Sequence, residues 1–255
     1  MSAEHLCSPE QLIGKSVLEV ISLLPTFPWY IKTDQWGKLI IPQITYLAIV
    51  DYDTKGLREP RMESDIYGGL LITPGVQIGM EKLSSLLVPK AGRTTGIISR
   101  VRVKEDEYND CPRIGAFAHI PFIDLDVGEI NLSPEEMLGV IKREIREKTE
   151  IDKGVILNSG GRPGHYHFIG TERLLSDEQF ITFMALCLGM NKQGKFLVDG
   201  EWVGHSLNPL KYMTQFDKEY GLEPRSKYDF GLRFATLRIT TSEEKPQLPV
   251  VVDFL

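Results

Sequence analysis

In the second half of the chain, hydrophobic residues either recur at helical spacing or form short continuous runs. The order of these two patterns predicts the order of helices and strands. Two capping boxes, which begin at Ser133 and Ser176, are each followed by apolar residues three or four positions apart, so we expect a helix over 134–148 and another from 177. Short apolar runs predict strands over 120–127, 154–158, 165–169 and 195–199. The order β-α-β-β-α-β is typical of a split βαβ, ferredoxin-like unit, in which helices cover one face of an antiparallel sheet.

The first half of the chain has a weaker pattern. A helix is expected over 9–24. Strands are expected here over 44–50, 69–73 and 95–103, and a further strand is expected near the end of the chain over 234–240. The N-terminal elements would form an α/β layer packed against the ferredoxin-like sheet, so the predicted fold class is α+β. We divide the chain into an N-terminal part, 1–114, and a C-terminal part, 115–255, and expect one compact unit because no clean linker separates them.

Composition argues against several classes of protein. The 255 residues are 42% hydrophobic and 25% charged, as is ordinary for globular proteins. No run of about 18 apolar residues is present, so we expect no transmembrane helix and no membrane partner. The three cysteines are widely spaced, which favours neither a disulfide framework nor a zinc site. Because the N-terminus also lacks the layout of a signal peptide, we expect a cytoplasmic protein.

The net charge of −6 argues against bulk electrostatic binding of nucleic acid, but the charge is unevenly distributed. From residue 82 to residue 104 there are six basic residues and no acidic one. Arg100, Arg102 and Lys104 alternate with valines, so a strand here would carry a basic stripe on one face. This stripe is either a nucleic-acid contact or an ordinary solvated strand face.

Two aspartates, one residue apart, end the strand expected over 120–127. In an extended strand Asp124 and Asp126 project from the same face, while Ile123 and Leu125 point into a core. Two carboxylates held this close raise each other's pKa unless a cation joins them. Hard divalent ions such as Mg²⁺ and Mn²⁺ are the usual partners of such a pair. The alternative is a solvated strand end without a ligand.

Other polar residues lie at the ends of the neighbouring strands. His165 and His167 begin the strand that follows a glycine-rich turn, and Asp199 ends the last strand of the unit. In the predicted sheet these strands lie close together. We therefore expect three carboxylates and a histidine to converge on one face.

The loop 159–164 adds groups that suit phosphate binding. It offers backbone N–H groups, the Ser159 hydroxyl and the Arg162 guanidinium at one place. Carboxylates, divalent ions and a phosphate-binding loop together favour phosphoryl or nucleotidyl transfer. A zinc hydrolase is less favoured, since zinc prefers several histidine or cysteine ligands.

Three short motifs occur in an order and spacing known from one family. They are Phe122-Ile-Asp-Leu-Asp126, Ser159-Gly-Gly-Arg-Pro-Gly-His-Tyr-His167 and Val198-Asp199. In this layout the chain resembles the archaeo-eukaryotic primase superfamily, and most closely its small stand-alone primase-like members, over about residues 115–250. The resemblance implies a primase-polymerase core, in which an RRM-like catalytic sheet within 115–255 packs on the N-terminal α/β layer.

The resemblance also implies roles for particular residues. Asp124, Asp126 and Asp199 would hold divalent ions, Mg²⁺ or Mn²⁺, and His167 would complete the catalytic set by contacting the phosphates of an incoming nucleoside triphosphate. Further nucleotide contacts are expected from Ser159, Gly160, Arg162, His165, His205 and Arg238. The template would be single-stranded DNA or RNA.

Some features depart from the family pattern. Glu201 and Ser206 stand in a stretch where relatives are expected to carry basic residues, which would weaken triphosphate binding. The loop after Ser159 is longer than the usual motif, and no zinc-binding cysteine set is present. Two alternatives therefore stay open. One is a catalytically degenerate member that binds nucleic acid within a larger replication, repair or defence assembly, and the other is a metal-dependent phosphodiesterase or nuclease.

Overall fold

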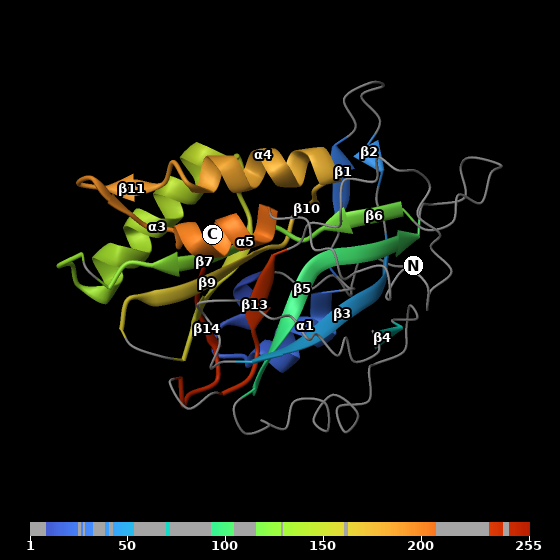
Figure 1. Ribbon diagram of the computed structural model, residues 1–255, viewed down its shortest axis with the longest axis horizontal. Helices are drawn as coiled ribbons and strands as arrows, with labels where there is room; N and C mark the ends of the chain where they lie inside the picture. Colours follow the sequence, from blue (N-terminus) through green and yellow to red (C-terminus); the bar gives the residue numbers. More distant parts are fainter. Residues whose placement is uncertain are drawn as a thin grey trace.

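The structure is a computed structural model of the chain. It describes residues 9–24, 27, 29–32, 39–40, 43–53, 70–71, 93–104, 116–128, 130–160, 163–207, 235–241 and 245–255. Two antiparallel sheets and the helices packed on them form the body of the molecule (Figure 1). The α+β class predicted from the sequence is therefore confirmed.

The first sheet has four strands in the order β14-β8-β9-β7. The strands are β14 (Val250–Phe254), β8 (Gly154–Asn158), β9 (His165–Gly170) and β7 (Phe122–Asp126). Each pairs antiparallel with its neighbour, and β8 and β9 are joined as a hairpin. Four of the five β8 residues are buried, which explains why its sequence is continuously apolar rather than alternating.

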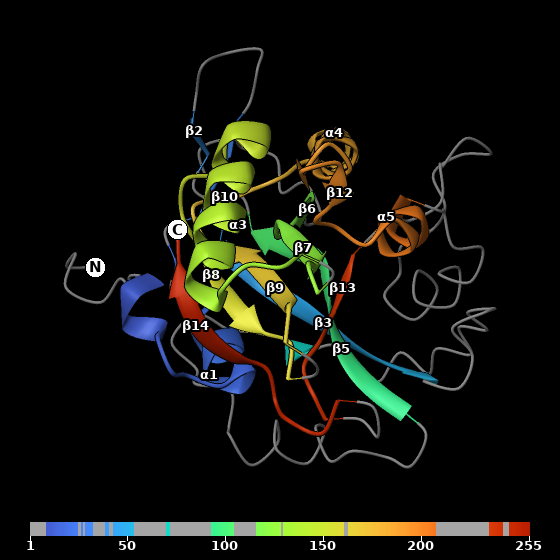
Figure 2. The ribbon, with the colours of Figure 1, turned by 90° about the vertical axis from the view of Figure 1, so that its left-hand side faces the viewer.

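Helices α3 (Pro134–Thr149) and α4 (Asp177–Cys187) lie beside each other on one side of this sheet (Figure 2). Both begin at the predicted capping boxes. The Ser133 hydroxyl accepts from the N–H of Glu136, and the Ser176 hydroxyl accepts from the N–H of Gln179. Helix α3 ends at Thr149 and is followed by its C-cap, Glu150, whose φ of 56° is left-handed. The buried stripe of α4 consists of Phe180, Phe183, Met184 and Cys187.

The second sheet has the order β13-β5-β3-β4, and β6 also pairs with β5. Its strands are β13 (Thr236–Arg238), β5 (Arg93–Lys104), β3 (Gln43–Asp53), β4 (Leu70–Leu71) and β6 (Ala116–His119). The long pair β3 and β5 has two register shifts, where bulges bend the strands. Strand β13 comes from the end of the chain, so this sheet is built from both predicted parts.

Smaller elements complete the described fold. Strands β1 (Tyr30–Lys32), β2 (Leu39–Ile40) and β10 (Arg173–Leu174) form a three-stranded sheet. Strands β11 (Asn191–Lys192) and β12 (Lys195–Phe196) form a short hairpin, and α5 (Gly200–Leu207) follows it. No helix of the described residues is long and apolar enough to cross a membrane.

The strand expected over 195–199 is split into two parts. Residues 195–196 belong to the hairpin, and only Val198 bridges to Leu125 of β7. The N–H of Asp126 donates to the carbonyl of Leu197 at 2.9 Å, and the N–H of Asp199 donates to the carbonyl of Asp124 at 3.3 Å. The segment 197–199 therefore lies along the edge of β7 that β9 does not occupy.

The prediction of one continuous helix over 9–24 is wrong. The structure has a 3₁₀ turn, η2 (Pro9–Leu12), and a separate helix α1 (Val17–Leu23). Gly14 lies between them with a left-handed φ of 78°, and its N–H donates to the carbonyl of Val251 at 2.9 Å. Ser16 then starts α1 through a capping box with Glu19. The apolar period continues across this break, which is why the pattern suggested one helix.

A single buried cluster connects the two predicted parts of the chain. It includes Leu24, Trp29 and Ile97 from the first part and Phe122 and Phe168 from the second. Residues of both predicted parts therefore contribute to one buried cluster, and the division at residue 114 into parts of one compact unit stays a prediction.

Candidate functional site

The predicted aspartates and histidines meet across β7 and β9. The strand register places Asp124 opposite His167 and Asp126 opposite His165, so all four side chains project from one face. The Asp124 Oδ1 to His167 Nε2 distance is 3.7 Å, and the Asp126 Oδ1 to His165 Nδ1 distance is 3.5 Å. The sequence predicted that alternate residues of each strand project from one face, and the structure has these four side chains on one face.

Asp199 lies on the opposite side of Asp124. The bridge between Val198 and Leu125 sets Asp199 beside Asp124 along the free edge of β7. Its Oδ1 accepts hydrogen bonds from the N–H groups of Glu201 at 2.9 Å and Trp202 at 3.2 Å. Asp199 is thus also the cap of α5, a role that the motif reading missed, and this fixes its carboxylate in place.

The electrostatics of the site centre on Asp124. Burial raises the pKa of its carboxyl to about 6, and the charges of Asp199 and Asp126 add to this rise, while Lys245 and Arg238 oppose it. Only 25% of the Asp124 side chain is exposed. An anion is therefore held here in an environment that disfavours it, which is the condition that a bound cation relieves.

His167 is buried and stays neutral at physiological pH. Burial lowers the pKa of its imidazole well below the usual range, and the positive charges of Lys245, Arg238 and His165 lower it further. A neutral imidazole can donate one hydrogen bond and accept another, or offer a lone pair to a metal. Its chemistry therefore suits a ligand-contacting role on this face.

Two cations approach the site from the C-terminal end of the chain. Arg238 is buried on β13, where its Nη1 donates to the carbonyl of Thr240, and β13 contacts β7. Arg238 was predicted from the sequence as a site residue. Lys245 was missed, because it follows two glutamates in a stretch that reads as an ordinary solvated charge run. Both affect the pKa values of Asp124 and His167.

The start of the predicted phosphate loop is tightly packed. The N–H of Ser159 donates to the carbonyl of His165 at 3.0 Å, and its buried hydroxyl has no hydrogen-bond partner among the described residues. Gly160 has a φ of 71°, and a Cβ built there would lie 1.9 Å from the Gln247 carbonyl oxygen. Gly160 therefore serves close backbone packing in this structure. Arg162 lies outside the described residues.

Several predicted residues lie elsewhere or are only partly described. His205 is an exposed residue of α5. Arg100 is largely buried on β5, and its Nη2 lies 4.0 Å from Asp177 Oδ2. Arg102 and Lys104 lie on the same strand, but their side chains are outside the described set. A nucleic-acid role for this stripe stays a prediction.

The described carboxylates do not form a ready-made metal cluster. Among the described residues, no group of three or more His, Cys, Asp or Glu side chains is placed to hold a metal ion. Asp126 Oδ1 instead accepts from the N–H of Gly128 at 3.4 Å and faces His165. The donor set still fits a hard divalent ion, because Asp124 and Asp199 are adjacent and Asp126 follows on the same face. Side-chain rotation would be needed to bring all three carboxylates together.

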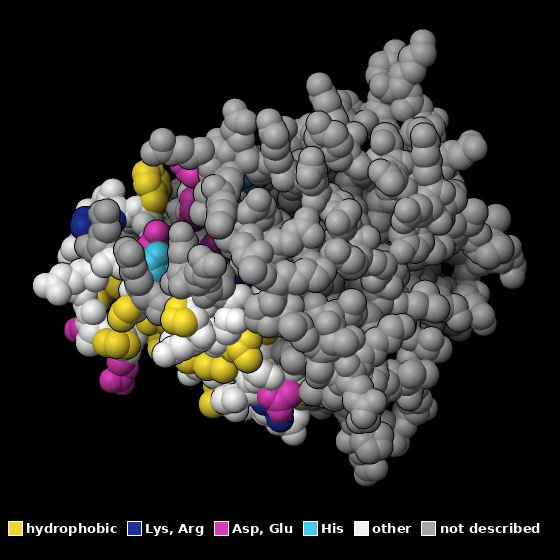
Figure 3. Space-filling model, turned by 60° about the horizontal axis from the view of Figure 1, so that its bottom comes forward, with side chains coloured by type: hydrophobic (Ala, Val, Ile, Leu, Met, Phe, Trp, Pro, Cys, Tyr) yellow, Lys and Arg dark blue, Asp and Glu magenta, His cyan; other side chains and the backbone are white. Residues whose placement is uncertain are grey.

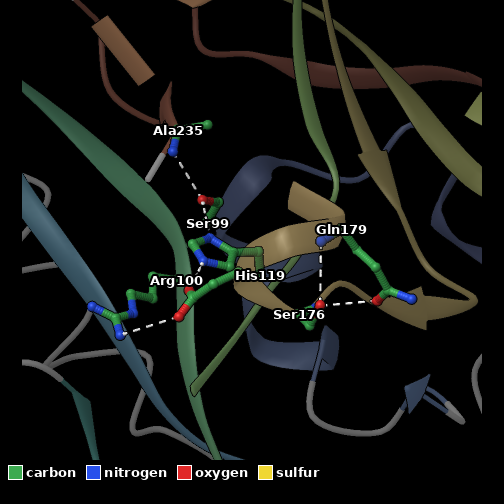
Figure 4. Close-up of polar contacts among 7 residues, drawn as sticks. Ser99, Arg100, His119, Ser176, Gln179 and Ala235 are labelled. Atoms are coloured by element: carbon green, nitrogen blue, oxygen red, sulfur yellow. Dashed lines mark hydrogen bonds and ion pairs between the residues drawn. The ribbon is translucent and has the colours of Figure 1, made fainter. Parts of the chain in front are cut away.

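A second polar network links the sheets and resembles a nucleophilic triad (Figure 4). Ser99 Oγ lies 3.3 Å from His119 Nδ1, and His119 Nε2 lies 2.8 Å from Asp177 Oδ1. Ser99 and His119 are fully buried, and the Ser99 hydroxyl accepts from the N–H of Ala235 at 2.9 Å. Because a substrate cannot reach a buried serine, this network holds the structure together rather than carrying nucleophilic chemistry.

Comparison with protein families gives a match over part of the chain. Residues 111–210 match a family model described as "AEP-like: Archaeo-eukaryotic primase 1D-like". No curated protein and no solved structure matches the chain. The matched segment contains β7, β9, α5 and all three motifs quoted from the sequence. Residues 111–210 are therefore similar to the archaeo-eukaryotic primase-like family.

Proposed function

We propose that this protein is a metal-dependent nucleotidyltransferase of the primase-polymerase type, which extends or initiates nucleic-acid strands from nucleoside triphosphates. The observation that carries the proposal is the row Asp199–Asp124–His167, in which a partly buried carboxylate lies between a second carboxylate and a neutral imidazole. The similarity of residues 111–210 to a primase-like family supports the same reaction class.

The sheet order supports an RRM-like arrangement of this part of the chain. With segment 197–199 counted as a reduced fourth strand, the order becomes 197–199, β7, β9, β8, and then β14 as an added edge strand. This is the order expected for a split βαβ unit whose first strand lies between the third and fourth. The acidic residues then lie on the two neighbouring strands that such a unit brings together.

The residues of the site would have different roles in this reaction. Asp124, Asp126 and Asp199 would hold one or two divalent ions, which supply activation of the attacking oxygen and neutralise charge on the leaving pyrophosphate. His167, as a neutral imidazole, would donate its N–H to a phosphate oxygen and orient the triphosphate. Arg238 and Lys245 would add positive charge on the same side.

The test is a strand-synthesis assay that also detects the alternatives. The full chain is incubated with Mn²⁺ or Mg²⁺, labelled nucleoside triphosphates and single-stranded DNA or RNA, with and without an annealed primer. The proposal predicts longer labelled strands and release of pyrophosphate in equal amounts. Shortening of the oligonucleotide without added nucleotides would instead identify a phosphodiesterase or nuclease.

One observation favours a second candidate, a degenerate member that binds nucleic acid without catalysis. Asp199 already caps α5, and the described side chains offer no ready metal cluster. This candidate predicts salt-dependent binding of oligonucleotides that is unchanged by Mn²⁺ and by substitution of the three aspartates. Calorimetric titration with Mn²⁺ separates the two, since the first proposal requires metal binding that is lost in Asp124→Asn.

A further inference from the structure

A short hairpin projects beside the candidate site. Strands β11 and β12 are joined by Gln193 and Gly194, whose φ values of 54° and 79° are typical of a type I′ turn. The two arms of the hairpin are also joined at its base, where the N–H of Leu197 donates to the carbonyl of Met190 at 3.1 Å. The carbonyl of Leu197 then accepts from the N–H of Asp126. The hairpin therefore continues directly into the segment that carries Asp199.

The side chains on this hairpin are unusual for a surface turn. Phe196 is 68% exposed, the largest value for a large hydrophobic residue among those described. Lys192 pairs with Lys195 in the strand register, so the hairpin carries two basic side chains on the same face. A largely exposed aromatic ring and two basic side chains on one hairpin both favour a ligand that has flat apolar faces and negative charge.

The position of the hairpin relates this ligand to the site. Figure 1 shows β11 at the same end of the molecule as the end of β7. On the face shown in Figure 3, acidic and histidine side chains gather at one end together with hydrophobic and basic side chains. The hydrogen bond between Leu197 and Asp126 places the base of the hairpin against β7, the strand that carries Asp124.

We propose that the β11–β12 hairpin binds single-stranded nucleic acid, with Phe196 stacked on a base and Lys192 and Lys195 in contact with phosphates. This inference rests on the proposed function, because the strand that the hairpin contacts would be the template. Every base presents a π face to an aromatic ring, so this contact would be tolerant of sequence. Lysines at the turn would make binding depend on salt.

A protein partner is the competing occupant of this surface. Leu186 and Leu188, near the end of α4, are also exposed and could extend an apolar patch toward the hairpin. The opposed lysines favour the nucleic acid, because an apolar protein interface would leave their charges poorly solvated. Leu188 is consequently the matched control, as an exposed hydrophobic residue close in sequence but outside the hairpin.

The experiment measures binding of a fluorescently labelled 20-nucleotide single strand to the full chain by anisotropy. Phe196→Ala should raise Kd about tenfold, while Phe196→Trp keeps it near the wild-type value. The double variant Lys192→Gln/Lys195→Gln should reduce the slope of log K against log salt by about 1.4. Leu188→Ala should leave Kd unchanged. Thermal unfolding checks that each variant keeps its fold.

Two results would overturn the inference. One is an unchanged Kd in Phe196→Ala, and the other is an equal loss of affinity in Leu188→Ala, which would indicate a general apolar surface for a protein partner. Strand synthesis is scored separately. If the wild-type chain extends strands but Phe196→Ala binds normally, only the hairpin inference fails. If no variant extends strands but Phe196 still controls binding, nucleotidyl transfer fails and the hairpin contact stands.

Discussion

At the residue scale, Asp124 combines two properties that oppose each other. Its carboxylate is partly buried beside two other aspartates, which disfavours the charge, yet the proposed reaction needs that charge to hold a metal ion. The alternation of side chains along β7 and β9 was enough to predict that Asp124, Asp126, His165 and His167 share a face. The cap made by Asp199 and the approach of Lys245 depend on tertiary structure, so no local pattern could predict them.

The first prediction is that Asp124→Asn stabilises the metal-free protein. The pKa of Asp124 is about 6 in the folded chain against 3.8 as its ordinary value, so folding becomes less favourable as pH rises between these values. Removing the charge should therefore raise the free energy of unfolding at pH 7.5 by about 1–3 kcal/mol. Urea unfolding measures this, with Asp152→Asn as an exposed carboxylate control. A clear loss of stability in Asp124→Asn would contradict the prediction.

The second prediction concerns metal addition. A ligand that binds only the folded state raises its stability, so Mn²⁺ should increase the Tm of the wild-type chain in a concentration-dependent way. Asp124→Asn should show little or no increase, and Asp152→Asn should respond as the wild type does. Differential scanning calorimetry with and without EDTA provides the measurement. Equal shifts in all three proteins would show that the metal binds elsewhere.

At the element scale, the capping boxes and strand runs predicted α3, α4, β8 and β9 closely. Propensity did not predict the break at Gly14, because the carbonyl of Val251 that Gly14 contacts lies at the other end of the chain. The polar network of Ser99, His119 and Asp177 was likewise not predicted from the sequence. It joins β5, β6 and the first residue of α4 through Ser99 and Asp177, with Arg100 nearby and Phe180 stacked on the ring at 4.1 Å.

The third prediction is a pH dependence from His119. Burial lowers the pKa of its imidazole, while hydrogen bonding to Asp177 and the charge of Asp177 oppose this. The unfolded chain then binds a proton near pH 6.5 that the folded chain does not, so this contribution to stability is present above 6.5 and is lost as pH falls. Urea unfolding at pH 7.5 and 5.5 should show a smaller loss in His119→Gln than in the wild type. Identical losses would contradict a neutral His119.

The fourth prediction compares two glycines. Gly164 has a φ of 93°, and a Cβ there would lie 2.5 Å from the Cα of Gly128, two residues after Asp126, the last residue of β7. Gly164→Ala should destabilise the fold by about 2 kcal/mol and disturb the Asp126–His165 pair. A Cβ at Gly139, which is exposed on α3, meets no atom within 4 Å. Gly139→Ala should therefore stabilise by about 0.5–1 kcal/mol. Equal changes in Tm for the two variants, measured by thermal unfolding, would contradict this prediction.

At the scale of the whole molecule, the site is larger than the segment that matches the family. Asp124, Asp199 and His167 lie within 111–210, but Arg238 and Lys245 come from beyond it. Strand β13 also pairs with β5 from the first part of the chain, and α5 is tied to it by the Trp202 Nε1 to Thr236 carbonyl bond of 2.8 Å. Sequence pattern predicted the motif segment well, whereas these long-range pairings needed the structure.

The fifth prediction tests the central proposal through the intact chain. Incorporation of labelled nucleotide into a primed single-stranded template is measured with Mn²⁺ for wild type, Asp124→Asn and Asp152→Asn. The account predicts extension by the wild type and by Asp152→Asn, and a loss of at least about 10²-fold in Asp124→Asn, because one carboxylate that holds the divalent ion is removed. Extension by Asp124→Asn at the wild-type rate, or no extension by the wild-type chain on any template, would contradict it.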